Sequence, residues 1–139
     1  MAKTYNPKRV QLAIGPHIVT GFADGTFIQV ERTSDQFQVV IGADGEAARA
    51  ASADKSGTLT LTLMQTSASN DFLSTALLTD EQTNLNTMPL LMKDVSGRTL
   101  VQAAEGWIKK YATIEFGKEI VSREWVYETG ELFIHEGGN

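Results

Sequence analysis

The segment "SGTLTLTLMQTS", from Ser56 to Ser67, alternates threonine with leucine and therefore predicts a β-strand. Successive side chains of a strand point to opposite faces of its sheet. One face of this strand carries Leu59, Leu61 and Leu63, and the other carries Thr58, Thr60 and Thr62. The leucine face must lie against a core, so the role of the strand depends on what the threonine face contacts: water, a partner subunit or a polar cargo.

The same period of two recurs along the chain, with turn residues between the alternating segments. One amphipathic helix is predicted from about Asn70 to Gln82, with Ser69 or Asn70 as its N-cap. We expect about seven strands in all, within the ranges 9–14, 16–22, 26–32, 36–42, 56–64, 88–110 (two strands around Ser96-Gly97) and 119–136 (one strand, or two with a bend at Thr129-Gly130). This pattern predicts a mainly β fold, a β-sandwich or open barrel, with one short helix on its flank.

The length of 139 residues fits a single domain spanning 1–139. The chain has no cysteine, no apolar run long enough for a membrane helix and no N-terminal signal-peptide pattern. Its net charge is −5, and residues 111–139 hold six glutamates against Lys118 and Arg123. No basic patch of the kind that nucleic-acid readers show is present.

The segment 42–57, "GADGEAARAASADKSG", lacks bulky apolar residues and cannot bury a core of its own. Long segments of this kind usually have a function in compact domains. We therefore expect an extended loop or hairpin arm with a function of its own. Its candidate contact residues are Gly42, Asp44, Gly45, Glu46, Arg49, Asp54 and Lys55.

The sequence shows no pattern that points to catalysis, to a cofactor or to a metal ion. The two histidines, His17 and His135, have no second ligand at metal-binding spacing, and His17 is expected at the surface. No nucleophile elbow or phosphate-binding loop occurs. Trp107 and Trp125 lie in strand patterns, where packing in the core or on a sheet face is the expected role.

Three parts of the chain resemble the tail tube proteins of contractile-tailed bacteriophages. They are "KTYNPKRVQLAIGPHIVTGFADGTFIQVER" (3–32), "SGTLTLTLMQTSASNDFLS" (56–74) and "FGKEIVSREWVYE" (116–128). The resemblance covers nearly the whole chain and rests on the order and extent of structural segments.

The resemblance implies a structural protein of the virion tail, made in the host cytoplasm, with no enzymatic activity and no cofactor. Members of this family form hexameric rings that stack into a hollow tube through which DNA passes into the host. The implied partners are other copies of the chain, a tail sheath protein outside, the baseplate and tail terminator at the ends, and phage DNA that passes without specific binding.

On this interpretation Thr58, Thr60 and Thr62 are a candidate polar wall of the lumen, since hydroxyls give a passing phosphate no positive charge to bind. An outer surface or a contact with the next subunit remains open for the same face. Two alternative functions also remain open. One is another β-rich virion component, such as a baseplate or tail-end ring. The other is a monomeric ligand-binding β-sandwich, which would need an aromatic or polar pocket and would expose Trp107 or Trp125.

Overall fold

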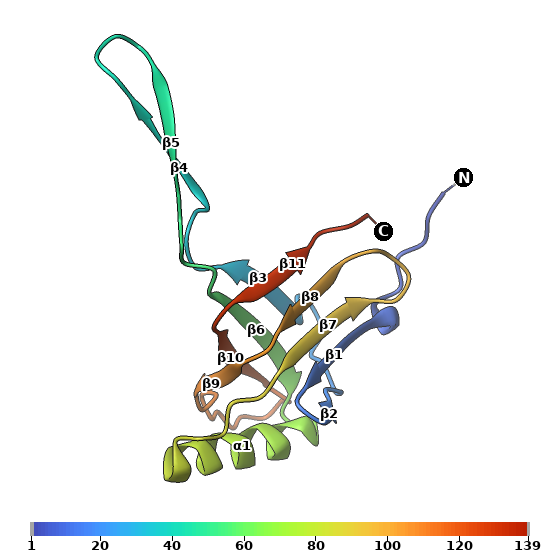
Figure 1. Cartoon of the computed structure of the whole chain (residues 1–139). Coiled ribbons are helices and arrows are strands. Elements are labelled where there is room, and N and C mark those ends of the chain that lie inside the picture. The colour runs from blue at the N-terminus through green and yellow to red at the C-terminus, as the bar shows by residue number, and fades with distance from the viewer. Residues whose placement is uncertain (1, 139) are drawn as a thin grey trace.

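Two larger sheets and one α-helix form the main part of the molecule, and a separate two-stranded hairpin projects from it (Figure 1). The structure is a computed structural model and describes residues 2–138. The five-stranded sheet has the order β11-β8-β7-β1-β2, the four-stranded sheet has the order β3-β6-β10-β9, and β4 pairs with β5 alone. All pairings are antiparallel.

The elements begin with a short 3-10 helix, Pro7–Arg9, and the single α-helix of the described chain is α1, Ser69–Thr83. The strands are β1 (Val10–Ile14), β2 (His17–Ile18), β3 (Ile28–Arg32), β4 (Phe37–Ile41), β5 (Ala47–Ala51), β6 (Gly57–Met64), β7 (Leu90–Asp94), β8 (Leu100–Ala103), β9 (Gly106–Lys110), β10 (Ser122–Thr129) and β11 (Leu132–His135). The predicted mainly β fold with one helix is confirmed. We call residues 2–32 and 57–138 the body.

The core of the body is built around β6, the Thr/Leu strand. Leu59, Leu61 and Leu63 are at most 1% exposed. They pack in one cluster with apolar residues of the five-stranded sheet and of α1, among them Leu12 and Leu73. Full burial of a leucine stabilises a fold by about 1.5–3 kcal/mol, so the alternation in β6 contributes directly to the stability of the body.

Helix α1 packs through residues spaced three and four apart, Leu73, Ala76 and Leu77, which are all buried. The predicted caps are wrong, because the first turn has no side-chain cap and both candidates bond elsewhere. Ser69 Oγ accepts from Thr20 N at 3.0 Å, and Asn70 Oδ1 accepts from Trp125 Nε1 at 2.9 Å. These bonds attach the helix to the rest of the core at the expense of local capping.

Two further expectations differ from the structure. The range 88–110 contains three strands instead of two, because β9 crosses to the four-stranded sheet and pairs with β10. His17 is half-buried instead of lying at the surface, since its ring stacks on Phe72 with centroids 4.4 Å apart and its Nε2 lies 2.9 Å from Ser69 Oγ. Both differences depend on contacts between segments about 20 to 50 residues apart, which local patterns do not contain.

Candidate assembly surfaces

The threonine face of β6 lies at the centre of the outer surface of the four-stranded sheet. In this sheet Thr58 stands opposite Glu31 of β3 and Glu128 of β10, while Thr60 stands opposite Gln29 and Val126. Residues directly opposite one another in an antiparallel pair point to the same face. All three threonines are half-buried, because their neighbours on both sides crowd them.

The charge on this face is mainly negative. Glu31, Glu124 and Glu128 flank the threonines, and Lys109 forms an ion pair with Glu128 at 3.5 Å. An exposed pair of this kind contributes little to stability, about 0–1 kcal/mol. The face therefore combines neutral hydroxyls and three carboxylates with two lysines at its β9 side, Lys109 and Lys110, of which Lys110 stands opposite Val126.

Both edges of the four-stranded sheet end in a strand with one paired side. Strand β3 pairs only with β6, and β9 pairs only with β10, within the described chain. One backbone acceptor at the outer edge of β9 is already used, because Met88 N donates to Gly106 O at 2.9 Å. The rest of this edge has no strand beside it among the described residues. An unpaired edge presents backbone donors and acceptors that can add a further strand.

The β4–β5 hairpin is the most exposed part of the molecule. All ten residues of its two strands are exposed, and Val39 keeps 69% of its surface in contact with solvent. Phe37, Val39 and Ile41 share one face with Arg49, whose guanidinium lies 4.2 Å from the centre of the Phe37 ring. An isolated two-stranded hairpin is marginally stable in water, so we expect another surface to complete it.

The base of the hairpin is held by hydrogen bonds around Asp54. Its carboxylate accepts from Ser34 Oγ at 2.7 Å, Ser56 Oγ at 2.6 Å and Ser56 N at 3.0 Å. The bonds from Ser56 and Ser34 lower the pKa of Asp54 to about 2. The base is thus held by side-chain hydrogen bonds, while β4 and β5 beyond it are exposed along their whole length.

The structure distributes the predicted arm residues over three places. Gly42, Asp44, Gly45 and Glu46 form the turn, where Gly45 has a φ of +86° and Gly42 N donates to Glu46 O at 2.8 Å. Arg49 lies on β5, and Asp54 and Lys55 lie at the base, where Lys55 O accepts from Leu132 N at 2.8 Å. The segment 42–57 therefore supplies only one strand of the hairpin.

Sequence reasoning missed the other strand, β4, as part of this surface. The range 36–42 is predicted as a strand, which is correct, and its residues Phe37, Val39, Val40 and Ile41 are exposed. One signal was available in the sequence. Three consecutive apolar residues from Val39 to Ile41 place apolar groups on both faces, whereas a strand on the surface of a core alternates.

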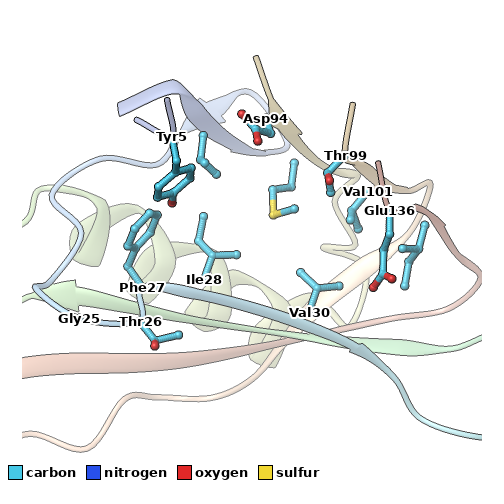
Figure 2. Close-up of a pocket in the computed structure, with 13 residues that line it drawn as sticks. Tyr5, Gly25, Thr26, Phe27, Ile28, Val30, Asp94, Thr99, Val101 and Glu136 are labelled. Atoms are coloured by element: carbon cyan, nitrogen blue, oxygen red, sulfur yellow. The ribbon is translucent and has the colours of Figure 1, made fainter. Parts of the chain in front are cut away.

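A cleft opens between β3 and the five-stranded sheet, as Figure 2 shows. Ile28 and Val30 of β3 form one side of it, and Val101 and Thr99 form the other. Trp125 is 4% exposed within the core, and neither tryptophan lines this cleft. Trp107 is half-buried and stands opposite Glu128 on the outer face of the four-stranded sheet, away from the cleft. The cleft itself is lined by the aromatic Tyr5 and Phe27 and by the carboxylates of Asp94 and Glu136.

Neither a metal-binding cluster nor a membrane-spanning helix occurs among residues 2–138. No group of three or more His, Asp or Glu side chains among residues 2–138 could hold a metal ion. The α-helix of that same stretch is neither long nor apolar enough to cross a membrane.

The open-edged sheet, its polar face and the exposed apolar hairpin are surfaces through which protein chains can associate. The profile of the family described as bacteriophage PhiTE tail tube protein matches residues 14–137, so the chain belongs to this family of phage tail tube proteins. It is a structural component of the phage tail and not an enzyme.

Individual relatives agree with this assignment. The chain is 31% identical over 144 residues to the structural protein ORF10 of Pseudomonas phage KPP10, an alignment that covers 98% of this chain and 83% of the relative. Three solved structures share the fold at lower identity. The chain is 8% identical to a protein in the sheath–tube complex of the extracellular contractile injection system PVC (TM-score 0.62, covering 95% of this chain and 91% of that one).

The other two structures are end components of such systems. One is in the sheath/tube terminator of PVC (TM-score 0.60, 9% identity, covering 97% of this chain and 99% of the other). The second is in the anti-feeding prophage cap, a tube-terminating cap (TM-score 0.57, 10% identity, covering 97% and 94%). The fold is therefore found in proteins of a sheath–tube complex, of a sheath/tube terminator and of a tube-terminating cap.

Proposed function

We propose that this protein forms hexameric rings that stack into the phage tail tube, and that DNA passes through the lumen of the tube. The observation that carries the proposal is the four-stranded sheet, with unpaired strands at both edges and a polar face between them. The number six comes from the resemblance to tail tube proteins.

Ring closure follows from the two different edges of the sheet. Strand β3 of one copy would lie beside β9 of the next, so the contact is head-to-tail. A head-to-tail contact closes into a ring when its rotation is a whole fraction of a turn. The joined sheets would then form one continuous wall, and a neighbour added at β3 would cover the cleft of Figure 2.

The threonine face would line the lumen. DNA affinity grows with each phosphate that a lysine or arginine neutralises, and a conduit must let the duplex slide. Thr58, Thr60 and Thr62, with Glu31 and the glutamates of β10 beside them, supply hydroxyls and negative charge that repel phosphate.

The same proposal assigns positions to the tail sheath, the baseplate and the tail terminator. The tail sheath protein would lie outside the tube, and the baseplate and tail terminator would lie at its ends. The hairpin, with the candidate contact residues of 42–57, would reach another subunit. A tail-end ring is a second candidate function, which the likeness to a terminator and to a cap favours.

Negative-stain electron microscopy of the purified protein over a concentration series tests this proposal. We expect hollow tubes or stacked six-fold rings. Single rings that never stack would favour the tail-end function. Monomers at every concentration, even with phage baseplates added as nuclei, would contradict both.

The lumen assignment has its own test in virions assembled with Thr60→Lys. The added amines would bind passing phosphate, so DNA ejection should slow, and the effect should weaken as salt is raised. Thr60→Ser is the matched control and should eject at the normal rate. If ejection with Thr60→Lys is also normal, the threonine face does not line the lumen.

A further inference from the structure

Both edges of the four-stranded sheet continue into segments outside the regular strands. On one side, residues 21–27 lead into β3 and lie beside the end of β6, since Ala23 N donates to Thr62 O at 3.0 Å. On the other side, the loop 111–121 joins β9 to β10, and β10 begins beside Met64, the last residue of β6. The two segments therefore lie at the same end of the sheet, on opposite edges.

In the proposed ring, these two segments of neighbouring copies would meet. Strands β3 and β10 both run antiparallel to β6, and β9 runs antiparallel to β10. Copies related by rotation about the ring axis keep their strand directions, so β9 of the next copy would run antiparallel to β3. The loop 111–121 that follows this β9 would then reach residues 25–27, which form one end of the cleft in Figure 2.

The loop 111–121 carries apolar side chains that its own chain leaves uncovered. Ile114, Phe116 and Ile120 are 69%, 81% and 64% exposed. Arg123 lies 5.3 Å from the centre of the Phe116 ring and covers only part of it. Aromatic side chains that fill pockets dominate the energetics of many protein interfaces. Phe116 is therefore the residue of this loop that we expect to enter the cleft.

The end of the cleft that the loop would reach already holds Tyr5 of the same chain. Tyr5 and Phe27 come from opposite sides of the cleft and lie at the same end of it in Figure 2. Val10 and Ile28 also line the cleft. Tyr5 keeps 58% of its surface exposed, so its ring covers this end of the cleft without being packed into the core.

The segment that carries Tyr5 is attached to the body only at its carboxyl end. The short 3-10 helix Pro7–Arg9 follows it, and Asn6 caps this helix by accepting from Lys8 N at 3.0 Å. Among the described residues, no hydrogen bond holds residues 2–5. Tyr5 can therefore leave the cleft by a movement of residues 2–5 that breaks no hydrogen bond and leaves the 3-10 helix in place.

We propose that Tyr5 competes with Phe116 of the next copy for this end of the cleft, so that the N-terminal segment restrains ring closure. The inference rests on the proposed function and adds a control to it. In the free chain, Tyr5 shields the apolar lining beside Phe27 from water. During closure residues 2–5 move away, and the aromatic ring of the neighbour takes the place of Tyr5. Since one aromatic contact replaces another, the restraint raises the concentration needed for rings and does not prevent them.

The concentration at which rings form, measured by sedimentation velocity and electron microscopy, tests the competition. An aromatic contact shifts an equilibrium by about two- to tenfold, so Tyr5→Ser should form rings at a concentration lower by about that factor. Tyr5→Phe keeps the aromatic ring and should match the wild-type protein. Phe116→Ser should need a higher concentration. Leu85→Ser is its control, since Leu85 is 83% exposed in the segment after α1.

The direction of the change in Tyr5→Ser separates restraint from support. A higher concentration than wild type would mean that Tyr5 belongs to the contact between copies, and an unchanged one would mean that it plays no part in closure. Either result would overturn the inference and leave the proposed function intact. If neither the wild-type protein nor Tyr5→Ser forms rings, even with phage baseplates added as nuclei, both are overturned.

A crosslink tests where the loop lies in the assembled ring. The chain has no cysteine, so each introduced cysteine reports one position. Thr26 is exposed at the Phe27 end of the cleft, and a Cβ added at Gly117 meets no atom within 4 Å. Rings assembled from a mixture of Thr26→Cys and Gly117→Cys and treated with a short bis-maleimide should give a crosslinked dimer that neither variant gives alone.

The opposite end of the cleft provides the control for this crosslink. Glu136 is exposed there, as Figure 2 shows, so Glu136→Cys mixed with Gly117→Cys should give far less dimer. No dimer with position 26, or an equally strong one with position 136, would overturn the inference.

Discussion

The body and the hairpin are both built from antiparallel strands, but the strands of the body bury apolar side chains and those of the hairpin leave them exposed. Strand β6 places three leucines in full burial, whereas β4 and β5 bury none of their ten residues. Both are regular antiparallel pairs with complete registers. Backbone pairing therefore does not by itself decide stability. The body has a core of its own, whereas the hairpin has none, and we propose that a surface of another copy completes the hairpin.

The largest difference between the body and the hairpin is expected when one apolar side chain is shortened in each of them. Leu61→Ala removes a side chain that is 0% exposed, and it should lower the free energy of unfolding by about 2–5 kcal/mol. Val39→Ala in the hairpin should change it by less than about 0.5 kcal/mol. Urea unfolding of the unassembled protein measures both. Equal losses would show that the hairpin is packed in the isolated chain.

The junction between the two regions gives the next largest effect. Gly57 begins β6 beside the base of the hairpin, and an added Cβ would lie 2.2 Å from Leu132 Cδ2 and 3.0 Å from Glu31 O. Gly57→Ala should therefore destabilise the body by about 1–3 kcal/mol through overpacking. Gly130→Ala, where a Cβ meets nothing within 4 Å, is the control. Thermal unfolding that finds the two variants alike would contradict this packing.

The smallest expected effect concerns the base of the hairpin and its pH dependence. Hydrogen bonds from Ser56 and Ser34 lower the pKa of Asp54 from 3.8 to about 2. Because the folded pKa is the lower one, this support is complete above about pH 4 and is lost as the pH falls towards 2. An NMR titration of Asp54 should show a midpoint near 2.

A double variant provides the control for that titration. Ser34→Ala with Ser56→Ala removes both hydroxyl donors, so the midpoint should move up towards 3.8. The body should show no matching change in its own resonances. A wild-type midpoint already near 3.8 would mean that the base is open in solution.

The same contrast explains what could be predicted from the sequence. In β6 and α1 the spacing of the apolar residues indicates which face is buried. The mainly β fold with one helix could therefore be predicted from the sequence. The crossing of β9 to the other sheet was not, because it depends on pairing with β10. The role of Ser69 was missed for the same reason, since Thr20 and His17 approach it from 49 and 52 residues away.

The candidate surfaces divide in a similar way. Thr58, Thr60 and Thr62 were identifiable because their alternation with leucine fixes their face. The hairpin was predicted only from its small residues in 42–57, since the apolar residues of β4 resemble those of a core strand. Ile114 and Phe116 alternate with Thr113 and Glu115 as residues of a half-buried strand do, yet this segment forms no strand and leaves Ile114, Phe116 and Ile120 exposed. Their exposure is visible only in three dimensions.

Amide hydrogen exchange of residues 37–51, measured in the unassembled protein and in assembled tubes, tests the central claim most directly. The claim is that the body folds alone and that a second copy completes the hairpin. It predicts rapid exchange of the hairpin amides in the free chain and strong protection in tubes, while β6 and β10 are protected in both states. Equal protection of the hairpin in the two states would contradict it.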